Sequence, residues 1–88
     1  MASYKVVLKP SVEKDLRSLP KSLITRVLRQ IEVLRDDPFS RRSVQLEDGE
    51  GLRRIRVGDY RVVYGVEKAE KIILIYYVRH RREVYRNI

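Results

Sequence analysis

The stretch from Arg53 to Tyr64 constrains this chain more than any other. It reads Arg-Arg-Ile-Arg-Val-Gly-Asp-Tyr-Arg-Val-Val-Tyr, with Gly58-Asp59 in the middle. Glycine readily takes the positive φ that tight hairpin turns require, so the stretch is predicted to form two strands joined by a two-residue turn. Side chains alternate across a strand, and one register therefore buries four of them: Ile55, Val57, Val62 and Tyr64.

The same register places three arginines together on the opposite, exposed face: Arg54, Arg56 and Arg61. Guanidinium groups that share one face repel each other and do not favour folding. We interpret them as a site for phosphate.

Length and charge bound the class of protein. The 88 residues form one domain spanning 1–88. They carry 20 Lys and Arg against 12 Asp and Glu, a formal net charge of +8, and most of this excess lies after Leu52. Such a charge indicates a nucleic-acid-binding protein or a protein with an acidic protein partner.

The residue types and segments that the sequence lacks predict the cellular compartment of the protein and its need for cofactors. The chain has no Cys, and the segment Met1–Lys5 contains no apolar signal region. The longest apolar run, Ile72–Val78, is too short to cross a bilayer. We therefore expect a cytoplasmic protein that is not inserted in a membrane. A single His and the lack of a close carboxylate pair in the C-terminal half disfavour metal-dependent hydrolysis, and no metal or other cofactor is expected.

The N-terminal half is predicted to contain a strand and two helices. Tyr4–Leu8 forms the strand, and Ser11–Leu19 a short helix with Ser11 as its N-cap. Pro20 starts a second helix, which ends at Asp36-Asp37-Pro38. Apolar residues recur in this helix at spacings of three and four: Ile24, Val27, Leu28, Ile31 and Leu34. Its arginines, Arg26, Arg29 and Arg35, are interpreted as a solvated outer face.

The remaining segments complete an α+β fold. The connection Phe39–Gly51 is functional or merely connecting, and Val44 and Leu46 form a short strand or anchor this loop to the core. Lys71–Val78 is apolar without alternation, which predicts an internal strand covered on both faces. The predicted fold is an N-terminal strand, a helical hairpin and a three-stranded antiparallel meander in one sheet, with the helices on one face.

The exposed arginines fit metal-free cleavage of RNA. The ribose 2′-OH supplies the nucleophile, and the protein must supply a base or orienting group, cations for the charge of the transition state, and an acid for the leaving oxygen. Arginines suit the second role. Tyr85 can stack on a base, and His80 can carry a proton near neutral pH. For His80, packing in the core or at a hinge is the favoured interpretation.

Two segments, Leu52–Tyr64 and His80–Tyr85, resemble the RelE/ParE superfamily of toxins from toxin–antitoxin systems. The resemblance extends to Lys9–Lys21 and to the end of the second helix at Asp37-Pro38, and so covers nearly the whole chain. It implies a microbial-ribonuclease-like fold and, for the RelE branch, ribosome-dependent cleavage of mRNA in the A site by the 2′-OH. It also implies a cognate antitoxin, with contact to DNA only through that antitoxin.

The resemblance also assigns roles to individual residues. The implied catalytic residues are Arg54, Arg56, Arg61, Arg81 and Tyr85. Beside these, we expect the basic residues Arg53, Arg79, Arg82 and Arg86 to bind RNA. The best-known RelE enzymes have lysine where this chain has Arg54 and Arg56, and an arginine practically cannot act as a base. These arginines therefore only orient and stabilise the substrate, or His80 or Tyr85 accepts the proton, or catalysis is weak.

Two alternatives to the RelE activity stay open. A ParE-like protein shares the fold, targets DNA gyrase and lacks the nuclease residues. A toxin-fold protein without activity would only bind a partner. The combination of Arg61, Arg81 and Tyr85 favours the RelE-like activity.

Overall fold

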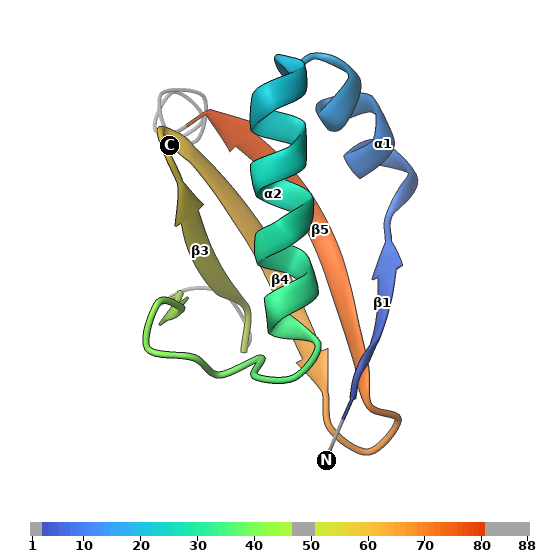
Figure 1. Cartoon of the computed structure of the whole chain (residues 1–88). Helices are drawn as coiled ribbons and strands as arrows, with labels where there is room; N and C mark the ends of the chain where they lie inside the picture. The colour runs from blue at the N-terminus through green and yellow to red at the C-terminus, as the bar shows by residue number, and fades with distance from the viewer. Residues whose placement is uncertain (1–2, 47–50, 81–88) are drawn as a thin grey trace.

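The computed structural model describes residues 3–46 and 51–80, and places in them one five-stranded sheet with two helices on one of its faces (Figure 1). In chain order the elements are β1 (Lys5–Leu8), α1 (Pro10–Arg17), α2 (Lys21–Leu34), β2 (Val44–Gln45), β3 (Arg53–Val57), β4 (Tyr60–Glu67) and β5 (Ile72–His80). Neither of these helices combines the length and the apolar character needed to cross a membrane.

The strands lie in the order β1-β5-β4-β3-β2, which confirms the predicted α+β fold. β3, β4 and β5 form the predicted antiparallel meander, and the two residues of β2 pair with β3. β1 pairs with β5 in parallel, from Lys5 opposite Ile72 to Leu8 opposite Ile75. The first strand therefore lies at one edge of the sheet, beside the last.

The β3–β4 hairpin has the predicted turn and register. Gly58 has a φ of 61°, a conformation that side chains with a Cβ rarely adopt. Val57 pairs with Tyr60 and Ile55 with Val62, so the apolar residues of both strands share one face. The four side chains predicted to be buried are at most 3% exposed.

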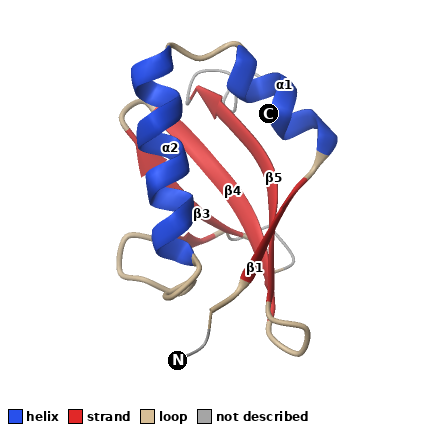
Figure 2. Ribbon diagram, turned by 45° about the vertical axis from the view of Figure 1, so that its right-hand side comes forward, coloured by secondary structure: helices blue, strands red, loops and turns tan. Residues whose placement is uncertain are grey.

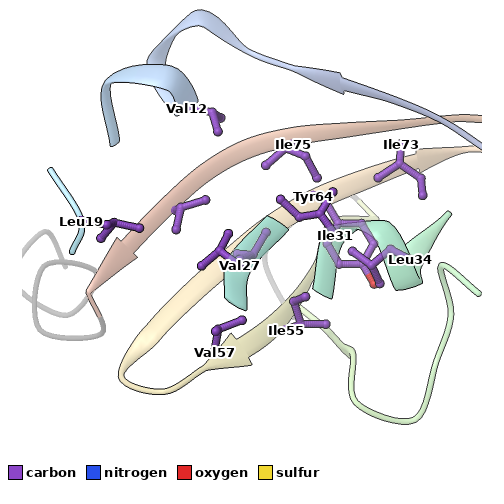
Figure 3. Close-up of a cluster of buried hydrophobic side chains, with 12 residues drawn as sticks. Val12, Leu19, Val27, Ile31, Leu34, Ile55, Val57, Tyr64, Ile73 and Ile75 are labelled. Atoms are coloured by element: carbon purple, nitrogen blue, oxygen red, sulfur yellow. The ribbon is translucent and has the colours of Figure 1, made fainter. Parts of the chain in front are cut away.

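Both helices lie over the apolar face of the sheet (Figure 2). α1 contributes Val12 to the core, and α2 contributes Val27, Ile31 and Leu34. Figure 3 shows these side chains with those of the sheet, between the helices and the strands. Full burial of one such aliphatic side chain contributes about 1.5–3 kcal/mol to folding.

The structure corrects the prediction that the last strand is covered on both faces. In β5, Ile73, Ile75 and Val78 are at most 2% exposed, while the residues between them are half-buried. β5 is internal, with a strand on each side along part of its length, but helices cover only one of its faces. Its uninterrupted apolar sequence therefore leaves apolar side chains on the face without helices.

α1 begins at Pro10, and Lys9 rather than Ser11 is its N-cap. Proline suits the first helical position because its fixed φ is helical and its missing N–H needs no partner. The Ser11 hydroxyl instead donates to the Tyr76 carbonyl at 3.4 Å, and the Asp15 carboxylate accepts from the Val78 N–H at 3.1 Å. β1 ends opposite Ile75, so α1 provides hydrogen bonds to the edge of β5 beyond that point.

The loop after α2 is anchored to the sheet by Tyr64. The Tyr64 side chain is fully buried, and its hydroxyl donates to the Pro38 carbonyl at 2.7 Å. A buried carbonyl that loses its partner destabilises the fold by about 1–3 kcal/mol. We therefore expect Tyr64→Phe to lower the free energy of unfolding by an amount in this range, measured by chemical denaturation.

Tyr77→Phe is the matched control for that measurement. Tyr77 is half-buried in the adjacent strand, and no hydrogen bond of its hydroxyl is seen within residues 3–46 and 51–80. Removal of this hydroxyl is expected to change stability by less than about 0.5 kcal/mol. Equal effects of the two substitutions would show that the Tyr64–Pro38 bond does not anchor the loop.

Candidate active site

Three arginines lie side by side across β3, β4 and β5. Arg56 pairs directly with Arg61, and Arg61 pairs directly with Arg79. Directly paired residues of an antiparallel sheet have their side chains on the same face. We call this set, Arg56, Arg61 and Arg79, the arginine row. It lies on the face of the sheet that the helices leave uncovered.

The pairing of like charges in the arginine row disfavours folding. The Cβ atoms of directly paired residues are about 4.5–5.5 Å apart, and like charges at such positions destabilise a sheet. A planar guanidinium offers several fixed N–H donors that match a phosphate. The row is therefore suited to an anion that spans more than one guanidinium.

The next row of the same face is Arg54, Val63 and Tyr77. The Arg79 guanidinium lies over the Tyr77 ring, with 4.8 Å from its central carbon to the ring centroid. A contact of this kind holds a guanidinium in place while leaving its charge available. Arg54 is a fourth cation on this face, beside the arginine row. The three strand arginines predicted to share the face, Arg54, Arg56 and Arg61, therefore do so.

The four arginines on this face of the sheet differ in their exposure to solvent. Arg56 is exposed, whereas Arg54, Arg61 and Arg79 are half-buried. The Nε atom of Arg61, in the middle of the row, is shielded from solvent. Partial removal from water strengthens the attraction between a cation and a bound anion. The position of Arg61 in the middle of the row, with its Nε shielded from solvent, suits it to contact a phosphate bound there.

A second group of arginines extends the basic surface around the edge of β3. A cleft of about 370 Å³ is lined by Arg26 and Arg29 of α2, by Arg42, and by Arg56. None of the described residues that line it is acidic. Arg42 is positioned by a 3.1 Å hydrogen bond to Gln30 Oε1. We call this cleft the basic cleft; because Arg56 belongs to both groups, it adjoins the arginine row.

The basic cleft revises the interpretation of the helix arginines. Arg26 and Arg29 are exposed, as expected of an outer face, but they converge with residues of a loop and a strand. Arg35 behaves differently, because it forms a 2.8 Å ion pair with Glu32 and donates to the Tyr4 carbonyl. Helical periodicity alone cannot identify such a cleft, since it depends on where the loop carries Arg42.

Arg53 does not lie on the face of the arginine row, and its assignment to RNA binding stays a prediction. It lies on the helix-covered face of β3, whereas Arg54 and Arg56 lie on the opposite face. Its Nε and Nη2 atoms donate to Ser43 Oγ at 3.0 and 2.8 Å. Its guanidinium also lies 5.3 Å from the centroid of the Phe39 ring. Arg53 therefore holds the loop before β3 in place.

His80 lies on the opposite side of the sheet from the arginine row. It pairs with Tyr60, and their rings are in edge contact with centroids 5.2 Å apart. Arg79, its neighbour in sequence, faces the other way because side chains alternate along β5. This position agrees with the packing interpretation and separates the imidazole from the row.

The remaining predicted site residues, Arg81, Arg82, Tyr85 and Arg86, lie outside the described residues. Their roles stay predictions. The structure adds Arg79 to the central row, whereas the sequence assigned it only to RNA binding. Once the pairing of β4 with β5 is known, the alternation of side chains along β5 places Arg79 on the same face as Arg61.

Comparison with known proteins identifies relatives along most of the chain. The family model described as the ParE toxin of the type II toxin–antitoxin system parDE matches residues 6–85. A Methanocaldococcus jannaschii protein that bears the toxin name RelE1 is 30% identical over 87 residues, which are 96% of this chain and 97% of the relative.

Solved structures share the fold. The archaeal RelE of Pyrococcus horikoshii, crystallised as a RelE–RelB complex, is 36% identical, with a TM-score of 0.80 over 90% of this chain and 96% of the other. The toxin–antitoxin complex RelBE2 of Mycobacterium tuberculosis contains a chain that is 26% identical, with a TM-score of 0.78 over 89% of this chain and 98% of the other.

Two arginines of one strand provide a test of the assignments. Arg56→Gln removes one charge from a repulsive row, so stability should stay the same or rise by a few tenths of a kcal/mol. Arg53→Gln removes the donors to Ser43 and should lower stability by about 1–2 kcal/mol. Chemical denaturation of both variants at low and high salt gives these values.

Salt distinguishes the two effects further. The gain in Arg56→Gln should shrink at high ionic strength because repulsion between exposed charges is screened. The loss in Arg53→Gln should persist because its hydrogen bonds are partly buried. A large loss of stability in Arg56→Gln would make this residue structural and remove it from the site.

Proposed function

Because the chain belongs to the RelE/ParE superfamily of toxins of type II toxin–antitoxin systems, we propose that it is an endoribonuclease that cleaves mRNA in the ribosomal A site. The observation that supports this activity is the arginine row on the uncovered face of the sheet. The direct pairing of like charges in the row disfavours folding, and its spacing suits a phosphodiester.

The proposed reaction is an intramolecular transesterification at one phosphodiester of the RNA. The 2′-oxygen attacks the adjacent phosphorus and loses its proton, a bond from phosphorus to this oxygen forms, and the bond to the 5′-oxygen breaks. The 5′-oxygen takes up a proton and leaves as a hydroxyl, and a cyclic phosphate remains. Negative charge grows on the phosphoryl oxygens in the transition state. Arg61, flanked by Arg56 and Arg79, is placed to stabilise that charge.

The role of the row in this mechanism is electrostatic. An arginine stays protonated at all ordinary pH values and does not act as a general base. Arg54, Arg56, Arg61 and Arg79 therefore orient and stabilise the phosphate. His80, on the other face with its ring against Tyr60, is assigned to packing. Tyr85 keeps its predicted role of stacking on the substrate.

The basic cleft supports binding to the ribosome as well as to mRNA. RNA presents one negative charge for each phosphate, and arginines are well suited to these groups. The cleft lies around the edge of the sheet from the row, and Arg56 belongs to both. The protein can thus hold an mRNA strand on the arginine row and a segment of ribosomal RNA in the basic cleft at the same time.

A ParE-like activity against DNA gyrase is the second candidate. The observation that favours it is the family model, which is described as a ParE toxin. The two activities leave different products. The nuclease leaves discrete breaks within codons at the A site, whereas the gyrase inhibitor leaves intact mRNA and trapped gyrase–DNA complexes.

The proposed partner is a cognate antitoxin. A groove of about 680 Å³ between α2 and β1 has apolar walls that include Val6, Leu8, Leu28 and Ile31. Leu28 is 46% exposed at this groove. We assign the groove to an amphipathic helix of the antitoxin, whose acidic residues would complement the net charge of +8. Related toxins crystallised as complexes with RelB support this partner.

Cleavage should depend on Arg61. In a translation extract, primer extension on mRNA should show breaks at A-site codons with the native protein. Arg61→Ala should reduce their rate by at least about tenfold to hundredfold, because one donor to the transition-state phosphate is lost. Thermal unfolding of both proteins, measured in parallel, separates this loss from a loss of structure.

Two further variants complete that assay. Arg17→Ala removes an exposed arginine of α1 that lies outside both the row and the cleft, and should leave cleavage unchanged. His80→Gln should retain both the cleavage rate and its pH profile. If His80→Gln folds normally but its cleavage rate no longer changes with pH near neutrality, as the rate of the native protein does, His80 would be the group that transfers the proton. Intact mRNA together with trapped gyrase complexes would replace the nuclease by the ParE-like activity.

Antitoxin binding should depend on Leu28. We expect Leu28→Glu to weaken binding of the product of the adjacent gene by about tenfold or more, because a charge would enter an apolar contact. Isothermal titration calorimetry measures the dissociation constant. Val33→Glu is the matched control, since Val33 is 51% exposed on the same helix but does not line the groove. Equal weakening by both substitutions would remove the groove from the interface.

A further inference from the structure

The face of the arginine row carries a second feature at its other end. A groove of about 330 Å³ is lined by Leu52, Gly65, Leu74 and Tyr76, with Glu67 at its rim. Gly65 lies four residues beyond Arg61 on β4, about 13 Å along the strand. We call this site the base groove. The residues that line it are half-buried or exposed, and among them Val66 also packs against the core.

A β-bulge in β5 builds one wall of the base groove. Val63 pairs with Tyr77, but the next residue, Tyr64, pairs with Ile75, so Tyr76 is the extra residue. Tyr77 lies on the face of the arginine row. Tyr76 lies on it too, since its ring covers the position above Gly65. Bulges redirect side chains in this way, often beside functional sites.

Gly65 allows the walls of the base groove to lie close to the sheet. A Cβ at this position would lie 3.2 Å from both Leu52 Cδ2 and Tyr76 Cε1, tighter than ordinary contact. Glycine within a strand costs about 0.5–1 kcal/mol relative to alanine, and is expected where other groups approach the backbone closely. The absence of a side chain here lets groups from two neighbouring strands approach the sheet.

The chemistry of the walls fits a flat aromatic ligand with donors on its edge. The Lys9 ammonium lies 4.1 Å from the Tyr76 ring centroid and holds that ring in place. Glu67 Oε1 accepts a 3.2 Å bond from the Ala69 N–H at the rim. An ionised carboxylate has about four acceptor sites, so Glu67 retains acceptors for a ligand. The volume lies at the small end of ligand sites.

We propose that the base groove binds an unpaired nucleobase that bears an amino group, on the same face as the phosphate held by the arginine row and about 13 Å along the strand from it. The inference rests on the proposed ribonuclease function and adds a determinant of sequence preference to it. Unpaired RNA bases are commonly recognised by stacking on aromatic side chains and by hydrogen bonds to their edges. The groove and the row lie on one face, within reach of neighbouring nucleotides of one strand.

Glu67 sets the expected preference. A carboxylate accepts hydrogen bonds from the amino groups of cytosine, adenine and guanine. Uracil has no amino group, and its N3–H donor lies between two carbonyl oxygens, whose lone pairs repel an approaching carboxylate. Discrimination against uracil should therefore be about tenfold, as expected for one hydrogen bond to a charged group.

Short RNAs that cannot be cleaved test this proposal directly. Trinucleotides methylated on every 2′-oxygen lack the nucleophile, so their binding does not require activity. The intact chain is titrated with an all-uracil trinucleotide and with versions that carry one cytosine or guanine. Nuclear magnetic resonance should show shifts of the Gly65 amide and of the Leu52 and Leu74 methyl groups, and about tenfold tighter binding of the amino-bearing RNAs.

Two carboxylate variants make the test specific. Glu67→Gln presents a donor as well as an acceptor, so uracil should bind nearly as well as cytosine, while binding through the arginines persists. Glu70→Gln, in the exposed turn and outside the groove, should leave the preference unchanged. A purely structural role of Glu67 would not change this ratio.

The proposal is overturned if the three groove residues do not shift, or if the native chain binds all the trinucleotides equally. It is also overturned if the antitoxin shifts these residues while no RNA does, since the groove would then be a protein contact. Lack of mRNA cleavage in extracts would instead reject the ribonuclease function, because the trinucleotide measurement needs no cleavage.

Discussion

The register between β3 and β4 is the constraint on which the rest of this structure depends. Side chains alternate with a period of two, so a slip of β3 by one residue against β4 would turn over the two faces of β3. Ile55 would then leave the core, and Arg56 would enter it. The turn at Gly58-Asp59 fixes this register, because its backbone requires a residue free to adopt positive φ. Packing and the arginine row are thus set by the same few hydrogen bonds.

The sheet separates two functions by face. The helices cover one face and supply the apolar burial that stabilises the chain, while the other face carries charges that oppose folding. Two side chains on the helix-covered face anchor the loop between α2 and β3. Tyr64 donates a hydrogen bond to the Pro38 carbonyl, and Arg53 donates to the Ser43 hydroxyl. Two neighbouring arginines, Arg53 and Arg54, therefore serve different ends because they point to opposite sides of one strand.

Local features of the sequence predicted the parts of the fold that depend on near neighbours. Alternation and a Gly-Asp turn were sufficient for the hairpin, and apolar spacing for α2. The parallel pairing of β1 with β5 was not predictable, because nothing in Lys5–Leu8 specifies a partner at the far end of the chain. The same holds for the site. Arg56 and Arg61 follow from one hairpin, whereas the cleft with Arg42 and the bulge at Tyr76 depend on tertiary structure.

The placement of β1 has a consequence for the order in which the chain can fold during its own synthesis. All strand partners of β1 lie in β5, and β5 is the last strand described. The N-terminal strand leaves the ribosome early but finds no strand partner until Ile72–Ile75 has also emerged. Long-range pairing of this kind is slow to form, because the loop must close before any contact offsets its entropy. A nascent chain therefore carries an unfinished sheet edge until β5 has left the ribosome.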